Sequence, residues 1–249
     1  MDLHLDGKTA IVTGASRGLG RATAEALLAE GARVVAAART TDALEELRAQ
    51  APDRVAVAPC DMRDLDAVAG LVDVALDAFG SLDVVVNNAG IAPAGAFLET
   101  GQDVWDDVFR INVMAPAALT RAAGRVLLEQ RHGKVINVAS LSGLRGKPVL
   151  AAYSASKGAM LRMTEAVAAE WADKGVQVNA IAPGGFATDA QAAVLADPEI
   201  TRRRVRKIPA RRMGESEEIG PLVCYLASPL SQFVSGATYV IDGGELNKL

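Results

Sequence analysis

A tyrosine and a lysine stand four residues apart in the stretch YSASK, at Tyr153 and Lys157. Residues with this spacing share one face of a helix. An unperturbed tyrosine has a pKa near ~10 and is a poor proton donor or acceptor at neutral pH. A neighbouring ammonium group favours the tyrosinate, so we expect it to lower the phenol's pKa by about two units. Such a phenol suits a general acid in ketone reduction and a general base in alcohol oxidation, although an isolated pair of this kind is usually a surface contact.

A glycine-rich segment, TGASRGLG at 13–20, lies between an expected strand and an expected helix. Its glycines, Gly14, Gly18 and Gly20, allow a sharp turn and the close approach of a phosphate to backbone amides. The helix N-terminus that follows offers free N–H groups and a favourable dipole. The spacing G-x-x-x-G-x-G differs from the commonest dinucleotide fingerprint. A simple tight turn is the alternative, and the position between first strand and first helix favours a dinucleotide site.

Two arginines bear on which dinucleotide would bind. Arg39 follows the second expected strand, and Arg17 lies inside the glycine-rich segment. An acidic residue in the region of Arg39 is typical of binding a free ribose 2′-hydroxyl. Arginine instead pairs with a 2′-phosphate through charge-assisted hydrogen bonds. Either arginine alone is typical of a solvated surface, and both together, with no competing acid, favour NADP(H) over NAD.

The elements that must position these groups alternate along the chain. Expected strands cover 8–13, 33–38, 54–59, 82–88, 134–140, 176–183 and 238–242, and expected helices cover 19–31, 42–50, 64–79, 104–130, 153–173 and about 216–227. This alternation predicts an α/β fold: a single Rossmann-type doubly wound domain over 1–249, with a seven-stranded parallel sheet flanked by helices on both faces. Ligands of such sheets bind beyond the carboxyl ends of the strands.

Composition narrows the class of protein. The chain has 249 residues, half of them apolar, a formal charge of −4 and two cysteines, Cys60 and Cys224. An acidic chain is a poor candidate for binding nucleic acid, and the cysteines stand in no metal-binding or disulfide pattern. The start lacks the basic region of a signal peptide, and no apolar run approaches the ~18 residues of a membrane helix. We expect a soluble cytoplasmic protein that binds no metal, nucleic acid or membrane.

Several motifs together resemble one family. TGASRGLG, NNAG at 87–90, Asn112, Ser140, YSASK and PGGFAT at 183–188 occur in the order and spacing of the short-chain dehydrogenase/reductase family. The resemblance spans essentially the whole chain, and within the family the chain is similar to 3-oxoacyl-(acyl carrier protein) reductases and to gluconate 5-dehydrogenase-like enzymes. It implies NADP(H)-dependent transfer of a hydride between the nicotinamide and a carbonyl or alcohol carbon.

The resemblance also implies four catalytic residues. Tyr153 exchanges the proton, Ser140 hydrogen-bonds the substrate oxygen, and Lys157 binds the ribose hydroxyls of the cofactor. Asn112 holds a water next to the lysine and extends a proton relay. An amide side chain inside the expected long helix at 104–130 is unusual, because asparagine has a poor helix propensity.

A larger set of positions is implied to bind the cofactor. These are Gly14, Ser16, Arg17, Gly18, Leu19, Gly20, Arg39, Asp61, Met62, Asn88, Ala89, Gly90, Tyr153, Lys157, Pro183, Gly184, Phe186 and Thr188. Asp61 accepts from the adenine amino group, with a helix cap as the alternative; we favour binding for Asp61 and the cap for Asp64. Phe186 stands where the family often has isoleucine or valine, so we expect a different pocket shape near the nicotinamide.

The substrate side is rich in basic residues. Arg202, Arg203, Arg204, Arg206, Lys207, Arg211 and Arg212 lie between Glu199 and Glu215 with no acid among them, and Arg145 and Lys147 follow Ser140. The resemblance places a mobile substrate lid at about 187–212. A solvated helical face and the recognition of an anionic substrate are both open. Arg131 and Lys174 match positions that dock an acidic carrier protein, and are also ordinary basic residues near helix C-termini.

The leading hypothesis is an NADP(H)-dependent oxidoreductase that interconverts a ketone and a secondary alcohol, most like a 3-oxoacyl-(acyl carrier protein) reductase. A sugar-acid dehydrogenase of the gluconate 5-dehydrogenase type is the alternative, and a catalytically silent NADP(H)-sensing protein is the alternative of another class. The substrate is expected to be a small carbonyl or alcohol, with an anionic or carrier-bound one as a specific option. The helix from 153 is apolar on several sides, so we expect one side to pack against a partner. The resemblance implies that this helix and the preceding long one form the interfaces of a homotetramer, and we expect a homotetramer or at least a dimer.

Overall fold

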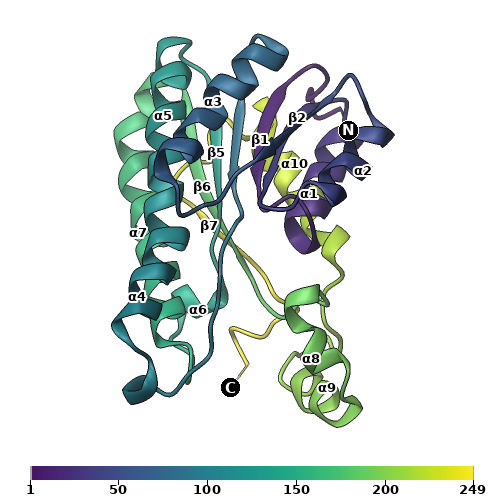
Figure 1. Ribbon diagram of the computed structural model, residues 1–249, viewed down its shortest axis with the longest axis vertical. Helices are drawn as coiled ribbons and strands as arrows, with labels where there is room; N and C mark the ends of the chain where they lie inside the picture. The colour runs from purple at the N-terminus through teal and green to yellow at the C-terminus, as the bar shows by residue number, and fades with distance from the viewer. Residues whose placement is uncertain (1, 249) are drawn as a thin grey trace.

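A seven-stranded sheet runs through the computed structural model, which describes residues 2–248 (Figure 1). The strands are β1 (Thr9–Thr13), β2 (Arg33–Ala38), β3 (Val55–Pro59), β4 (Val84–Asn87), β5 (Gly133–Val138), β6 (Val176–Pro183) and β7 (Thr238–Ile241). All pairs are parallel, in the order β3-β2-β1-β4-β5-β6-β7. Every residue of β1, β4, β5 and β6 is buried, as expected for strands covered on both faces.

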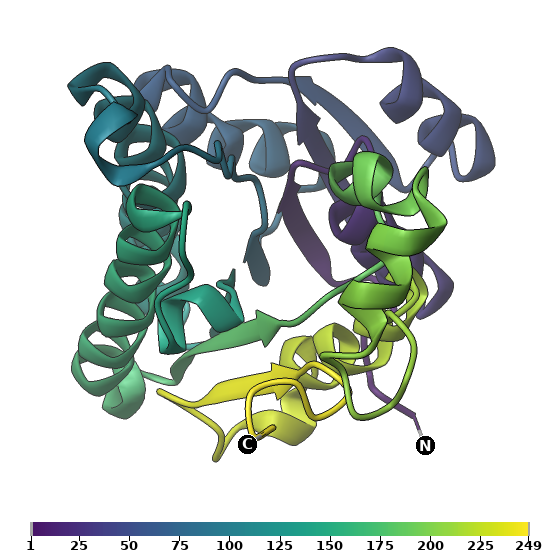
Figure 2. The same cartoon turned by 90° about the horizontal axis from the view of Figure 1, so that it is seen from below.

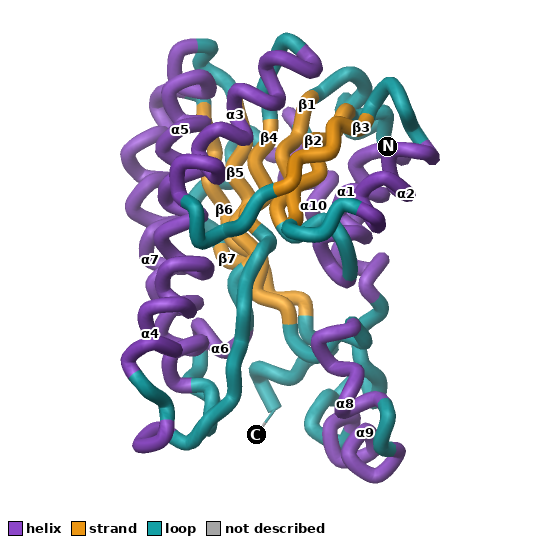
Figure 3. The backbone as a smooth tube through the Cα atoms, in the orientation of Figure 1, coloured by secondary structure: helices purple, strands orange, loops and turns teal. Residues whose placement is uncertain are grey.

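Helices pack against both faces of this sheet (Figure 3). The helices of the described chain are α1 (Gly18–Ala29), α2 (Asp42–Gln50), α3 (Leu65–Phe79), α4 (Gln102–Phe109), α5 (Ala115–Glu129), α6 (Leu141–Leu144), α7 (Ala151–Trp171), α8 (Ala192–Leu195), α9 (Pro198–Val205) and α10 (Gly220–Ala227). One apolar cluster joins α1, α2 and α10 to the sheet, and a second joins α3, α5 and α7. The expected fold is confirmed. The strand order reverses between β1 and β4, which places a ligand crevice at their carboxyl ends.

The helix expected over 104–130 is interrupted. The structure has α4, then a π-helical turn η2 (Arg110–Met114), then α5. Short 3-10 turns complete the chain: η1 (Phe97–Glu99), η3 (Ala172–Lys174), η4 (Asp189–Gln191), η5 (Ser216–Ile219) and η6 (Pro229–Ser231). Asp64 caps α3 as predicted, accepting from the amides of Asp66 and Ala67 at 3.1 and 3.0 Å.

The segment from η4 to α9 stands away from the sheet, beyond the carboxyl ends of its strands (Figure 1, lower right). Seen from that end, α8 and α9 lie on one side and α4, α6 and α7 on the other (Figure 2). This segment lies within the range 187–212 expected for the lid, and the lid remains a prediction. Within residues 2–248, no helix has both the length and the apolar character to cross a membrane.

Candidate active site

A groove of about 620 Å³ follows the carboxyl ends of β1 to β6. Of the residues predicted to be catalytic or cofactor-binding, all except Asn112 line it. The groove collects loops that are far apart in the sequence, because parallel strands present their carboxyl ends at one edge of the sheet. The predicted residues are therefore together in space, and their individual roles remain predictions.

The glycine-rich segment forms one wall of the groove. Gly18 has a φ of +53°, a conformation that favours glycine, and a side chain on Gly20 would collide with the Gly14 carbonyl. No side chain in the described chain caps the first turn of α1. Amides at such a helix start are suited to bind a phosphate. The residues present thus fit a dinucleotide, which needs both the close approach and the free donors.

Thr13 supports this wall and was not identified from the sequence. Its hydroxyl accepts from the amides of Asn88 and Ala89 at 3.0 and 3.1 Å. The Asn88 side-chain amide donates to the Thr13 carbonyl at 2.8 Å. These bonds fix the loop after β4 against the end of β1, so that Asn88 and Ala89 face the groove.

At the other end of the groove, Arg17 and Arg39 are both exposed. Neither side chain forms a hydrogen bond or ion pair within residues 2–248. Two guanidinium groups with free donors at one end of a dinucleotide groove fit a ribose 2′-phosphate.

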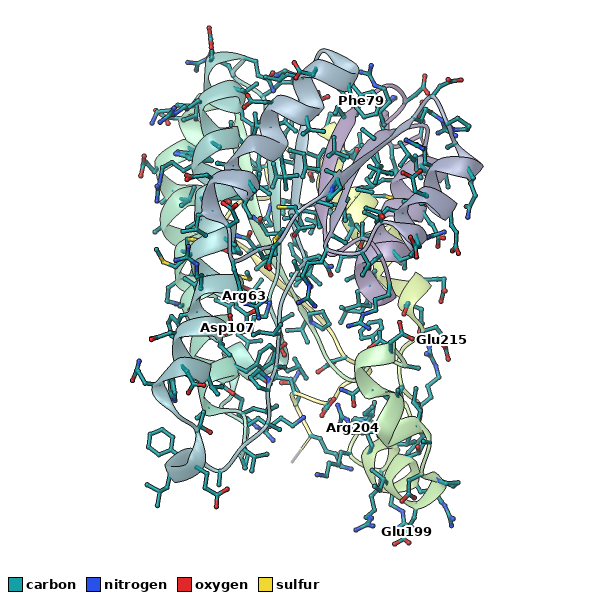
Figure 4. All side chains as sticks on the ribbon, viewed as in Figure 1. Arg63, Phe79, Asp107, Glu199, Arg204 and Glu215 are labelled. Atoms are coloured by element: carbon teal, nitrogen blue, oxygen red, sulfur yellow. The ribbon has the colours of Figure 1, made fainter. Side chains whose placement is uncertain are left out.

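The part of the groove next to Asp61 contains an ion pair that was not predicted from the sequence. The Arg63 guanidinium binds Asp107 through two hydrogen bonds of 2.6 and 2.7 Å, and Figure 4 labels the two residues side by side. This hydrogen bond lowers the pKa of Asp107. Asp61 accepts from the Arg63 backbone amide at 3.0 Å and lies 3.5 Å from its guanidinium. Asp61 lines the groove with carboxylate oxygen still accessible, which is compatible with its predicted adenine contact.

The catalytic candidates meet where α7 passes the end of β5. Ser140 is the N-cap of α6, and its hydroxyl accepts from the Ser142 amide at 3.1 Å. Lys157 is almost completely buried, and its Nζ donates to the Val138 carbonyl at 2.7 Å. The same Nζ lies 5.9 Å from the centre of the Tyr153 ring. Tyr153, Ser140 and Lys157 line one stretch of the groove.

The predicted direction of the Tyr153 pKa shift is wrong in this structure. Burial raises the pKa of the phenol, and a hydrogen bond with Ser140 opposes that rise only in part. Burial also lowers the pKa of the Lys157 ammonium to about 8. The sequence reasoning counted the charge of the lysine but not the desolvation of both groups. The phenol is thus held protonated at neutral pH.

Asn112 lies behind the groove in the π-helical turn. Its Oδ1 accepts from the Ile91 amide at 2.9 Å, and its Nδ2 donates to the Ile91 carbonyl at 2.9 Å and to Ser156 Oγ at 3.0 Å. Both Nδ2 protons are thereby used. The π turn explains how an amide can point out of a helix at this position. The predicted water between Asn112 and Lys157 remains a prediction, and Ser156 was not anticipated.

Most basic residues of the expected lid face solvent, in line with the solvated alternative. Arg203 pairs with Glu199 at 3.3 Å and Arg212 with Glu218 at 2.6 Å. Arg204 differs, because it points inward from α9 (Figure 4) and binds Glu245. The expected carrier-docking residues, Arg131 and Lys174, lie next to the amino ends of β5 and β6, at the opposite end of the sheet from Tyr153.

The chain belongs to the short-chain dehydrogenase/reductase family. The family model described as Enoyl-(Acyl carrier protein) reductase matches residues 14–245. The chain is 37% identical to a 3-oxoacyl-[acyl-carrier-protein] reductase of Synechocystis, over 96% of this chain and 97% of that one. It is 35% identical to a gluconate 5-dehydrogenase of Gluconobacter oxydans, over 96% and 95%.

A solved structure gives the same family assignment. The gluconate 5-dehydrogenase of Burkholderia cenocepacia, in complex with NADP and tartrate, matches with a TM-score of 0.94 and 31% identity over 100% of this chain and 98% of that one. The family and fold expected from the sequence are confirmed. The expected oxidoreductase class and the expected cofactor agree with these relatives, whose names cover more than one substrate.

Proposed function

We propose that this protein is an NADP(H)-dependent oxidoreductase that reduces a ketone to a secondary alcohol, or catalyses the reverse reaction. The proposal depends on one observation: Ser140, Tyr153 and Lys157 line the same groove as the glycine-rich segment and the two arginines with free donors. NADPH, when bound, supplies the hydride. The residues of this chain orient the substrate and move the proton.

The roles of these side chains follow from their surroundings. Ser140 hydrogen-bonds the substrate oxygen, and Tyr153 donates its proton to that oxygen as negative charge develops there. A phenol whose pKa is raised by burial is fully protonated at neutral pH, as a proton donor must be. Lys157 keeps a positive charge below about pH 8 next to the phenol and the ribose position. Asn112 holds the Ile91 loop and Ser156 in place behind them.

For the substrate, the structure supports the sugar-acid alternative better than the carrier-bound one. Arg131 and Lys174 lie far along the sheet from Tyr153, so within one chain they cannot hold a carrier at the groove. Arg204 instead points inward from α9 close to the groove, and the charge of Lys147, which follows α6, acts on the same cluster. A small keto acid fits this arrangement. A 3-oxoacyl thioester is the second candidate, favoured by the reductase relative and requiring docking residues from a neighbouring copy.

A substrate panel with both nucleotides tests the proposal. Oxidation of NADPH and of NADH is followed with 5-keto-D-gluconate, L-sorbose and acetoacetyl-coenzyme A. We expect turnover with NADPH and a ketone, with the keto acid preferred. Tight NADPH binding without turnover on the whole panel would instead favour a nucleotide-sensing protein, and turnover of the thioester alone would favour the carrier-linked reductase.

We also propose that the protein acts as a homotetramer in the cytoplasm, with 187–212 as a mobile lid. On α7, Ala155 and Ala166 are exposed, and Met163 and Val167 are only partly covered. An apolar helix face left open by its own chain is suited to pack against a second copy. Light scattering checks the assembly, and protease protection of 187–212 by nucleotide and substrate checks the lid.

A further inference from the structure

Arg204 is set apart from the other basic residues of its segment. Its guanidinium donates to both carboxylate oxygens of Glu245, at 2.5 and 2.7 Å. The side chains of this pair are only 16% and 21% exposed, whereas the neighbouring Arg203 is 67% exposed. A two-point match between guanidinium and carboxylate is the strongest and most directional of the common ion-pair geometries.

Two glycines place this ion pair beside the groove. Gly184, which lines the groove, lies next to the C-terminal segment 242–248, the tail. A Cβ on Gly184 would lie 3.3 Å from Glu245 Oε2. A Cβ on Gly185 would lie 2.5 Å from the Arg204 guanidinium. Both glycines precede Phe186, another residue of the groove wall. The PGG sequence after β6 therefore makes room for a guanidinium–carboxylate pair at the substrate side of the groove.

Positive charge exceeds negative charge around this pair. The pKa of Lys147 is lowered by burial and by Arg204, raised by Glu245 and lowered again by Lys207, so all three charges act on it. Lys147 is exposed, and its backbone amide donates to the Ser154 hydroxyl of α7 at 3.2 Å. Lys147 thus lies within range of two other cations and of one carboxylate.

The other acid of the tail is already engaged. Asp242 accepts from the amides of Gly244 and Leu246 at 2.7 and 2.6 Å, and so shapes the turn that presents Glu245. Arg145 donates to the Leu246 carbonyl at 3.4 Å and brings a further cation to the same tail. The cluster is therefore electrostatically suited to a second, external carboxylate.

We propose that Arg204, with Lys147 and Lys207 beside it, binds a carboxylate of the substrate, and that the Glu245 carboxylate occupies this place in the free enzyme. This inference rests on the proposed function and specifies its substrate class as a keto acid. The substrate carboxylate displaces Glu245 from the guanidinium, and the tail carboxylate turns to the neighbouring lysines. Glu245 is then an internal competitor that sets the affinity for the keto acid. It does not affect the binding of neutral ketones, because they do not contact Arg204.

A pair of matched ketones tests this. L-sorbose is 5-keto-D-gluconate with a hydroxymethyl group in place of the carboxylate, so the two probes differ at the proposed contact. Glu245→Gln weakens the internal competitor, and we expect the KM for the keto acid to fall several-fold while the KM for L-sorbose stays unchanged. Arg204→Met removes the contact, and we expect the keto-acid KM to rise about tenfold or more, the scale of a charge-assisted hydrogen bond.

The control is Arg203→Met, one residue away on the same helix, with an exposed side chain paired to Glu199. It should change neither KM. Melting temperature and NADPH affinity show whether each variant is folded; if Arg204→Met is not, Glu245→Gln decides alone. The inference is overturned if Glu245→Gln raises the keto-acid KM, or if Arg204→Met affects both ketones equally, because the pair then only fastens the tail to α9.

A binding measurement separates this inference from the proposed function. Calorimetric titration of D-gluconate into the protein saturated with NADPH gives a complex that cannot react, and we expect Glu245→Gln to bind it more tightly and Arg204→Met more weakly than the wild type. Equal binding by all three, or none, overturns the inference. Absence of turnover with every ketone, together with the expected order of gluconate affinities, rejects only the proposed reaction.

Discussion

The catalytic centre and the substrate-side rim, formed by 187–212 and the tail 242–248, are built in opposite ways. In the centre, Asn112 is 0% and Lys157 is 3% exposed; Asn112 is hydrogen-bonded to the Ile91 backbone in the loop after β4, and Lys157 to the Val138 carbonyl at the end of β5. In the rim, the eight-residue helix α9 carries Arg203, which pairs with Glu199 of the same helix, and Arg204, which pairs with Glu245 of the tail. The rigid core therefore fixes the geometry of proton transfer, while the rim is free to set substrate preference.

A buried lysine with a lowered pKa is not by itself a candidate catalytic residue. Lys134 has its pKa lowered by burial to about 8, like Lys157. It is bound by Gln177 at 2.7 Å and Ser231 at 3.0 Å, at the amino end of β5 and away from the groove. A shifted pKa is therefore common to a structural and a candidate catalytic lysine, and only the position beside Tyr153 and the groove distinguishes them.

The largest effect is expected from Tyr153→Phe, which removes only the proton donor of the centre. General acid catalysis contributes roughly 10²–10⁴-fold, so we expect kcat to fall by about 10³-fold or more. NADPH affinity, measured by fluorescence titration, should change little because the ring remains. Residual activity within tenfold of wild type would contradict the proton role and would move the chemistry elsewhere in the groove.

Next in size is Arg39→Asp, which acts at the nucleotide end and leaves both the centre and the rim intact. Replacing a free guanidinium by a carboxylate removes the partner for a 2′-phosphate and repels it. We expect the ratio of kcat/KM for NADPH over NADH to fall by roughly 100-fold, on the scale of a charge-assisted hydrogen bond. Arg17→Met should give a smaller change in the same direction. An unchanged ratio in both variants would place the 2′-phosphate site elsewhere.

Asn112→Ala tests whether the centre depends on support from behind. The variant leaves the Ile91 backbone and the Ser156 hydroxyl without their partner. A buried polar group left unpaired lowers the free energy of unfolding by about 1–3 kcal/mol. We expect a lower melting temperature and a fall in kcat of about tenfold. Ser156→Ala removes one of these bonds alone and should reproduce a smaller part of the loss in stability. If Asn112→Ala melts as the wild type does, the π turn is held by other contacts.

Local and long-range signals explain how much of this could be predicted. The alternation of strands and helices and the glycine-rich segment are local patterns, and they predicted the sheet and one wall of the groove. The resemblance to a known family implied most of the other site residues, while groove residues such as Arg63, Ile91 and Asp189 were not predicted. The Arg63–Asp107 and Arg204–Glu245 pairs join positions more than 40 residues apart, which no local pattern connects. The direction of the Tyr153 pKa was wrong for the same reason, because burial is a property of the packed chain.

The pH dependence of kcat/KM for a neutral ketone tests the catalytic centre independently of the rim. Lys157 is charged below about pH 8, and Tyr153 is protonated to higher pH. We expect kcat/KM for the reduction of L-sorbose, a neutral ketone, to be flat from pH 6 to about 7.5 and to fall by up to tenfold per unit above about 8. Lys134→Met, which removes the other lysine of similar pKa, should leave this profile unchanged. A profile that is flat to pH 10 would contradict a role for the Lys157 charge.

The smallest effect concerns the seam where the rim meets the centre. The Phe186 ring packs on Gly214. A Cβ on Gly214 would lie 2.8 Å from this ring, so the ring or the backbone would have to move. The backbone at Gly214 is not in the left-handed region, so Gly214→Ala tests the contact and not the backbone. We expect a loss of about 1–2 kcal/mol in unfolding free energy from overpacking.

The variant Phe186→Val, with the smaller side chain common in the family, should recover most of that loss when combined with Gly214→Ala, giving a coupling energy in a double-mutant cycle. Gly146→Ala is the control, because a Cβ there meets no atom within 4 Å, and it should be close to neutral. If the double variant is as unstable as Gly214→Ala alone, the glycine serves the turn before η5 and not the shape of the groove, and Phe186 then sets the pocket independently of the rim.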